Sequence, residues 1–149
     1  MFQEQSVFMF VHEIMSRKII KVDNSSSINY AVELMLRSSR DEVLILKDVN
    51  SSLYETNVEG IVTKSDIANL KRDRIDFTQP IGKFINKERT VLTISESETA
   101  RAARDMMMDK GIGRLLVVEK NTMIGMVTAR DLLSTFYLKI EEIELQLRT

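Results

Sequence analysis

The chain contains the same short motif twice. Residues 60–66 read Gly-Ile-Val-Thr-Lys-Ser-Asp, and residues 125–131 read Gly-Met-Val-Thr-Ala-Arg-Asp. Both copies follow one pattern: Gly, two apolar residues, Thr, two variable positions and Asp. A pattern that recurs within 149 residues indicates one supersecondary unit that is made twice and packs against its own copy. This repeat limits the possible folds more than any other feature of the sequence.

The likeness between the two copies extends upstream of the motif. Residues 27–35 correspond to residues 99–107 at a constant spacing of 72 positions (99 − 27). Apolar residues in these segments recur at the spacing of one helix face, so a helix is predicted in each copy. The same spacing places the apolar run 43–46 on 115–118, and both runs are typical of strands that are buried on both faces.

The repeat unit is therefore predicted to be strand, helix, strand, strand, helix. The lead strands are expected at residues 19–22 and 90–94, and the final helices at 64–72 and from 129 to about 147. At the motif the spacing drops to 65 (125 − 60), which puts seven extra residues into the first hairpin, within residues 48–59.

The predicted fold class is α/β (α+β), with two pseudo-symmetric β-α-β-β-α repeats packed into one module. The predicted limits are residues 8–72 for the first repeat, 73–80 for a linker, 81–140 for the second repeat and 141–149 for a C-terminal helix extension.

Composition excludes several classes of function. The net charge of −1 argues against nucleic-acid binding, which requires a basic face. The chain has no Cys, which excludes disulfides and thiol catalysis, and its one histidine, His12, lacks partners for a metal site. No targeting segment or membrane span is visible, so a cytoplasmic protein without membrane contact is expected. Because no nucleophile, base and orienting acid can be assembled, we expect no enzyme.

The element order, with Gly-x-x-Thr-x-x-Asp at the last strand-to-helix junction, resembles the cystathionine-β-synthase (CBS) domain. Two tandem copies resemble a CBS pair, also called a Bateman module, and Ile14-Met15-Ser16 opens the first copy as such domains often open. The likeness covers about residues 11–138. It implies two clefts between the repeats that bind AMP, ADP, ATP or S-adenosylmethionine, with no tightly bound cofactor. It also implies a regulatory role and association into homodimers. Since no second domain is visible, the effector protein is expected to be another chain.

The motif residues suit an adenosine ligand. One carboxylate can accept hydrogen bonds from both ribose hydroxyls, and Asp66 and Asp131 are the candidates. Thr63 and Thr128 stand at helix entrances, where free backbone N–H groups favour phosphate. Thr-x-x-Asp is also the pattern of a helix capping box, so a purely structural role remains an alternative.

The two clefts are not expected to be equivalent. The second copy offers cations beside its motif, whereas Asp41 and Glu42 in the first copy are expected to repel a polyphosphate. Solvated surface charges are the alternative for these cations. We therefore expect one good site, centred on Asp131. The candidate ligand-binding residues are Thr90, Val91, Ile112, Gly113, Arg114, Thr128, Arg130 and Asp131 in the second copy, and Ile19, Ile20, Thr63, Lys64 and Asp66 in the first.

A function of a different class is also compatible with the sequence. A CBS pair that has lost its ligand can persist as a dimerisation or interaction scaffold. The C-terminal segment carries an apolar stripe at helical spacing, which requires a surface to pack on and favours self-association. The stripe consists of Leu132, Phe136, Ile140, Ile143 and Leu147.

Overall fold

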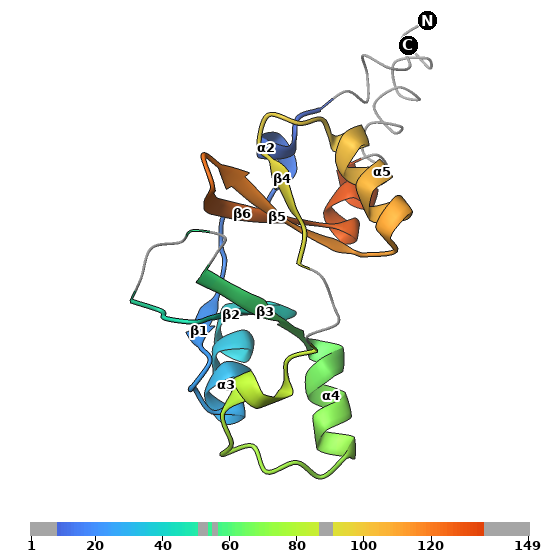
Figure 1. The fold of residues 1–149 in the computed structure, drawn as a ribbon. Coiled ribbons are helices and arrows are strands. Elements are labelled where there is room, and N and C mark those ends of the chain that lie inside the picture. Colours follow the sequence, from blue (N-terminus) through green and yellow to red (C-terminus); the bar gives the residue numbers. More distant parts are fainter. Residues whose placement is uncertain (1–8, 51–53, 55–56, 87–90, 136–149) are drawn as a thin grey trace, which may run out of the picture. The chain divides into compact units, whose positions relative to one another are not determined.

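The computed structural model describes residues 9–50, 54, 57–86 and 91–135 (Figure 1). These residues form two compact units. One unit lies within Ile19–Val91, and the other combines residues 9–18 with residues 92–135. The second unit is thus built from two separate parts of the chain, and each unit is described by itself below.

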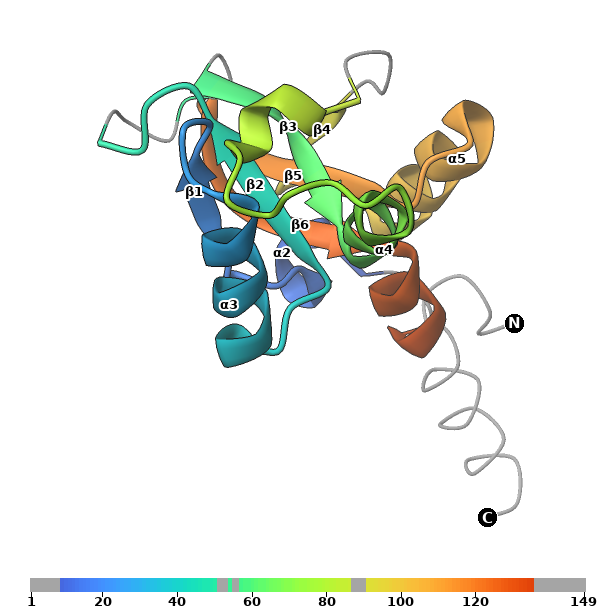
Figure 2. The ribbon, with the colours of Figure 1, turned by 90° about the horizontal axis from the view of Figure 1, so that it is seen from below.

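The first unit contains one three-stranded sheet. Its elements are β1 (Lys21–Asp23), α3 (Ile28–Ser38), β2 (Glu42–Leu46), β3 (Val58–Thr63), α4 (Lys64–Arg72) and the 3₁₀ helix η2 (Ile81–Phe84). The strand order is β1-β2-β3, with β2 parallel to β1 and antiparallel to β3. Figures 1 and 2 show α3 beside β1 and β2, where the crossover from one parallel strand to the next places it.

The second unit repeats this arrangement. Its elements are α2 (Val11–Ile14), β4 (Thr93–Ser95), α5 (Ala100–Lys110), β5 (Arg114–Glu119) and β6 (Thr122–Thr128), followed by helix over residues 129–135. The strand order is β4-β5-β6, again with one parallel and one antiparallel pair. The predicted order of strand, helix, strand, strand, helix is confirmed in both repeats, and so is the mixed α/β class.

Equivalent residues begin and end the two long helices. Ser27 caps α3 by accepting a hydrogen bond from the N–H of Tyr30, and Thr99 caps α5 by accepting one from Ala102. Both helices end at a residue in the left-handed region, which is Ser39 (φ 53°) after α3 and Gly111 (φ 63°) after α5.

Each unit has its own apolar core. The predicted helix face is confirmed, because Ile28, Ala31 and Met35 of α3 are buried against β2, as are their counterparts Ala100, Ala103 and Met107 on α5 against β5. All of β2 is buried, and so are Leu115, Leu116 and Val117 of β5, as expected for strands covered on both faces.

Residues 9–18 complete the core of the second unit. The side chain of Val11 is fully buried among residues of α5, β5 and β6. Backbone hydrogen bonds join its N–H to the carbonyl of Glu98 (2.8 Å) and connect Ser16 with Met126 in both directions (2.8 and 2.9 Å). A side chain at Gly125 would place its Cβ 2.8 Å from the carbonyl oxygen of Ser16, so this close approach requires glycine.

The lead strands differ from the prediction. They cover Lys21–Asp23 and Thr93–Ser95 rather than 19–22 and 90–94. The regular parallel ladder begins where Lys21 pairs with Leu44 and Thr93 with Leu116, and it ends after three residue pairs. Just before each lead strand, one backbone hydrogen bond still links the chain to the sheet. The N–H of Leu44 donates to the carbonyl of Ile20, and the N–H of Leu116 donates to that of Leu92 (both 2.9 Å).

The two hairpins differ as the change in spacing predicted. In the second unit β5 and β6 are joined by Lys120 and Asn121 alone, with φ angles of 51° and 67°, the conformation of a two-residue turn with both central residues left-handed. In the first unit residues 47–57 connect β2 to β3. The expected final helix is present over residues 129–135, and its expected continuation to about 147 lies outside the described residues.

Candidate functional site

The second copy of the motif forms a capping box. Thr128 is the last residue of β6, and helix begins at Ala129. The backbone N–H of Thr128 donates to Oδ2 of Asp131 (2.9 Å), and the N–H of Asp131 donates to Oγ1 of Thr128 (3.2 Å). These reciprocal bonds satisfy two backbone donors at the helix entrance and hold the carboxylate in one orientation.

The first copy has the same geometry. The N–H of Thr63 donates to Oδ2 of Asp66 (2.8 Å), and the N–H of Asp66 donates to Oγ1 of Thr63 (3.3 Å). The structural role that the sequence left open is therefore real at both junctions. It does not exclude ligand contact, because within the described residues the cap uses only Oδ2 of Asp131 and leaves its second carboxylate oxygen available.

The structure gathers several candidate residues at the second junction. Gly113 accepts a hydrogen bond from the N–H of Ala129 (2.9 Å), and Arg114 pairs with Thr128 across the β5–β6 ladder. Arg114 is half-buried, whereas Arg130 is exposed. Two arginines therefore lie beside the capped residues: Arg114 is opposite Thr128 in the ladder, and Arg130 directly precedes Asp131 in the chain. The nearby Ile112 packs against the core of this unit.

The equivalent place in the first unit has a different charge arrangement. The backbone carbonyl of Asp41 accepts a hydrogen bond from the N–H of Lys64 (2.8 Å), and Glu42 pairs with Thr63 as Arg114 does with Thr128. Glu42 is buried, and its Oε1 lies 2.8 Å from the guanidinium of Arg40. The expectation of two repelling acids overlooked this ion pair, which offsets one of the charges. The signal in the sequence was a cation two positions before the acid.

The lead-strand candidates lie in less accessible places. Ile20 is 9% exposed and packs in the core of the first unit, while Ile19 is half-buried. Val91 is half-buried, and Thr90 lies outside the described residues.

Of the candidate residues, Lys64 also borders a pocket. This pocket of about 370 Å³ lies in the first unit where α3 meets the start of α4. Its lining includes Val32, Met35, Leu36 and Ile67, with Ser39, Arg40, Asp41 and Lys64 as the polar residues. The apolar lining comes from helix faces, and sequence reasoning assigned none of these residues to a site.

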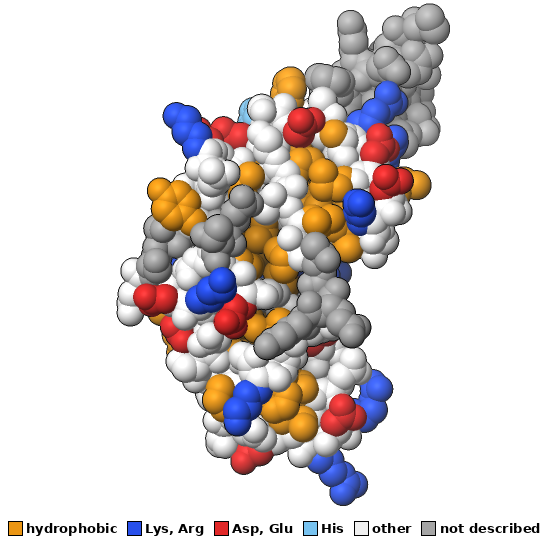
Figure 3. All heavy atoms as spheres, in the orientation of Figure 1, with side chains coloured by type: hydrophobic (Ala, Val, Ile, Leu, Met, Phe, Trp, Pro, Cys, Tyr) orange, Lys and Arg blue, Asp and Glu red, His pale blue; other side chains and the backbone are white. Residues whose placement is uncertain are grey.

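Other kinds of site find no support in the described residues. Among them, no group of three His, Cys, Asp or Glu side chains could hold a metal ion. No helix in the described ranges is long and apolar enough to cross a membrane. On the face seen in Figure 3, acidic and basic side chains are interspersed.

Comparison with known proteins identifies the family. The CBS domain matches residues 11–73 and 85–137, and the chain belongs to this family. Protein MJ1225 of Methanocaldococcus jannaschii is 25% identical over 121 residues, which are 81% of this chain and 40% of that protein. A homoserine O-acetyltransferase of Methanocorpusculum labreanum is 32% identical over 125 residues, 83% of this chain and 23% of the relative. The chain therefore spans less than half the length of these two relatives.

Solved structures confirm the fold of a tandem CBS pair. The CBS domain pair of protein MJ0100, in complex with 5′-methylthioadenosine and S-adenosyl-L-methionine, has a TM-score of 0.72 at 23% identity, covering 89% of this chain and 98% of that chain. The CBS domain protein PAE2072 of Pyrobaculum aerophilum, complexed with AMP, has a TM-score of 0.68 at 17% identity, with coverages of 83% and 89%.

Proposed function

We propose that this chain is a regulatory, non-catalytic module that binds an adenosine-containing ligand and signals its presence to a partner protein. The observation that carries the proposal is the second junction, where the capped Asp131 follows Thr128 and Thr128 pairs with Arg114. The adenosine compounds bound by MJ0100 and PAE2072 support the class of ligand, which is AMP, ADP, ATP or S-adenosylmethionine.

In this proposal each group at the second junction has one role. Asp131 accepts hydrogen bonds from the ribose hydroxyls through the oxygen that the helix cap leaves available. Arg114 and Arg130 attract phosphate through their positive charges, and the dipole of the helix that begins at Ala129 also favours an anion there. Thr90, Val91, Ile112 and Gly113 border the adenine. The matching residues of the first repeat are Ile19, Ile20, Thr63, Lys64 and Asp66.

The second junction is proposed as the better phosphate site. At the position equivalent to Arg114, the first unit has the buried Glu42, whose charge is offset by Arg40. Binding regulates the partner by population shift: the ligand stabilises one arrangement of the module over another, and the partner recognises the difference.

The test measures thermal stability with AMP, ADP, ATP, S-adenosylmethionine, NAD and GTP. A binder gains stability with ligand concentration, and one adenosine compound is expected to raise the Tm in a saturable way. Asp131→Asn should abolish most of that rise, because it removes the carboxylate charge while an amide oxygen can still cap the helix. Asp66→Asn makes the same change in the equivalent cap of the first unit, and it should reduce the rise less, because the second junction is proposed as the better site.

The outcomes are distinct. If Asp131→Asn retains the full ligand-induced rise, the site assignment is wrong. If no adenosine compound stabilises the wild-type protein at millimolar concentration, the sensing function is wrong.

One observation favours a second function, that of a dimerisation scaffold. Leu36 on α3 and Met108 on α5 occupy equivalent repeat positions (108 − 36 = 72) and are 76% and 75% exposed. Burial of such side chains would favour the association of two chains. Sedimentation of wild-type protein and of a Leu36→Ser/Met108→Ser variant tests this: a wild-type homodimer should dissociate in the variant, and a wild-type monomer would contradict the proposal.

A further inference from the structure

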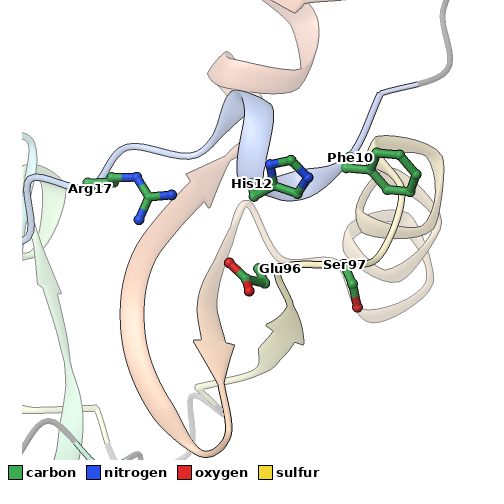
Figure 4. A pocket seen from close by; sticks show the side chains of 5 residues that line it. All are labelled: Phe10, His12, Arg17, Glu96 and Ser97. Carbon is green, nitrogen blue, oxygen red and sulfur yellow. The ribbon is translucent and has the colours of Figure 1, made fainter.

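A second pocket lies wholly within the second unit, away from the Thr128–Asp131 junction in the sequence. It has a volume of about 430 Å³ and is lined by Phe10, His12, Arg17, Glu96 and Ser97 (Figure 4). This volume lies within the range of small-molecule sites. Its walls come from two segments, α2 with its flanking residues and the loop between β4 and α5.

Backbone hydrogen bonds fix these two segments to one another. The N–H of Val11 donates to the carbonyl of Glu98 (2.8 Å), and the N–H of His12 donates to the carbonyl of Glu96 (3.1 Å). The loop is also braced by the hydroxyls of Ser95 and Ser97, which lie 2.9 Å apart. Contacts of the backbone therefore hold the two segments in place before a ligand binds.

Two opposite charges in the pocket have no ion-pair partner. Within the described residues, neither the guanidinium of Arg17 nor the carboxylate of Glu96 takes part in a salt bridge. Figure 4 shows their charged ends turned toward one another across the pocket. A molecule that carries an anion and a cation a few bonds apart complements such a pair.

Flat rings form the remaining wall. The side chains of Phe10 and His12 are stacked, with ring centroids 5.7 Å apart and an interplanar angle of 6°. Phe10 is 36% exposed, so part of its ring is accessible. Aromatic groups of a ligand pack favourably against such a surface.

We propose that this pocket binds a free α-amino acid with an aromatic side chain. Arg17 receives the carboxylate, Glu96 receives the ammonium group, and the side chain lies against the rings of Phe10 and His12. A free aromatic α-amino acid carries an anion, a cation and a ring in one small molecule. The proposal does not depend on nucleotide binding at the Thr128–Asp131 junction.

The test follows backbone amide signals by NMR during titration with L-phenylalanine, 3-phenylpropanoate and 2-phenylethylamine. The two analogues each lack one of the charges. Saturable shifts are expected for the amides of His12, Ser97 and Glu98 with L-phenylalanine, and at least tenfold weaker binding with either analogue. No saturable shift with millimolar L-phenylalanine would overturn the proposal, as would equal affinity for all three compounds.

Variants locate the binding. Arg17→Gln and Glu96→Gln should each weaken L-phenylalanine binding at least tenfold. Glu98→Gln is the control, because Glu98 is an exposed acid of the same loop that does not line the pocket. Unchanged affinity in both pocket variants contradicts the assignment. Asp131→Asn should bind L-phenylalanine normally, which separates a failure here from a failure of the proposed nucleotide site.

Discussion

At the scale of single residues, the repeated Thr and Asp have a structural role in both copies, and we propose that Asp131 also contacts the ligand. Each pair closes a helix entrance through reciprocal hydrogen bonds, and this fixes the carboxylate before any ligand arrives. Neighbouring residues then distinguish the two copies. Glu42 and Arg114 occupy equivalent positions next to the motif but carry opposite charges.

The buried ion pair beside the first motif should be important for stability. The side chains of Arg40 and Glu42 are 21% and 7% exposed. Glu42→Gln is expected to lower the free energy of unfolding by about 1–3 kcal/mol, because the largely buried guanidinium of Arg40 loses its interaction with the charge of Glu42. Urea denaturation measures this. The control is Glu33→Gln, which breaks the exposed Arg37–Glu33 pair and should change stability by less than about 0.5 kcal/mol. Equal effects of the two variants would contradict the expectation.

A second residue-scale prediction concerns Asp23. The backbone N–H of Ser25, then its hydroxyl and then the N–H of Val49 hold the pKa of Asp23 below its ordinary value of 3.8. The charged form therefore stabilises the fold above pH 3.8, and this contribution is lost as the pH falls through the lowered pKa. An NMR titration of the carboxyl carbon should give a midpoint below 3.8, and Ser25→Ala should raise it. A midpoint at or above 3.8 in the wild type would contradict this.

At the scale of elements, the two repeats reach the same shape with different local chemistry. Both α3 and α5 end in the left-handed region, but only α5 has glycine there. Likewise, one hairpin closes with two residues in left-handed conformations, and the other needs residues 47–57. Such differences identify positions where the residue in one copy fits the local backbone conformation less well than its counterpart in the other copy.

The ends of the two long helices provide a matched experiment. Ser39→Gly should stabilise the protein by about 1 kcal/mol, because glycine adopts a φ of 53° without the clash that a Cβ introduces. Gly111→Ser should have the opposite effect at φ 63°. Thermal unfolding measures both. Ser38→Gly, one residue earlier and still helical, should destabilise, so stabilisation by both serine replacements would show that the conformation of residue 39 is not the cause.

The close approach at Gly125 gives a prediction for β6. A Cβ there would lie 2.8 Å from the backbone oxygen of Ser16 and from Sδ of Met15. Gly125→Ala should therefore disrupt the Ser16–Met126 hydrogen bonds, visible as faster hydrogen exchange of both amides. Gly113→Ala is the control, since its Cβ would meet only the Cβ of Ala129 at 4.0 Å. Unchanged exchange in Gly125→Ala would contradict the role of this contact.

At the scale of the whole molecule, the two repeats along the sequence do not coincide with the two compact units of the structure. Residues 9–18 lie at the start of the first predicted repeat (8–72) but belong to the unit formed by residues 92–135. The predicted limits 8–72 and 81–140 describe the repeats along the chain, whereas the units are defined by packing. Each unit keeps a separate core.

The assignment of residues to two units predicts which part of the chain loses stability when one core residue is truncated. Val11→Ala should cost about 2 kcal/mol and reduce the hydrogen-exchange protection of amides in residues 92–135, because Val11 is fully buried in that core. Val22→Ala makes the same change in the other core, where Val22 is 1% exposed, and should act on residues 19–86. If either variant reduced protection equally throughout the chain, the two units would be one cooperative unit and the prediction would be wrong.

The sequence by itself determined the repeat, the order of its elements and the place of the Thr-x-x-Asp motif at each strand-to-helix junction. These follow from periodicity, helix caps and turn residues, which depend on neighbours close along the chain. Only the tertiary structure decided that residues 9–18 complete the second unit, that Arg40 neutralises Glu42, and that the lead strands begin at Lys21 and Thr93. It also brought Arg17 and Glu96 to one pocket. Most of these features depend on contacts between segments far apart in the chain, which no local pattern records. The Arg40–Glu42 pair is local, but the sequence spacing does not fix the side-chain geometry that brings the two charges together.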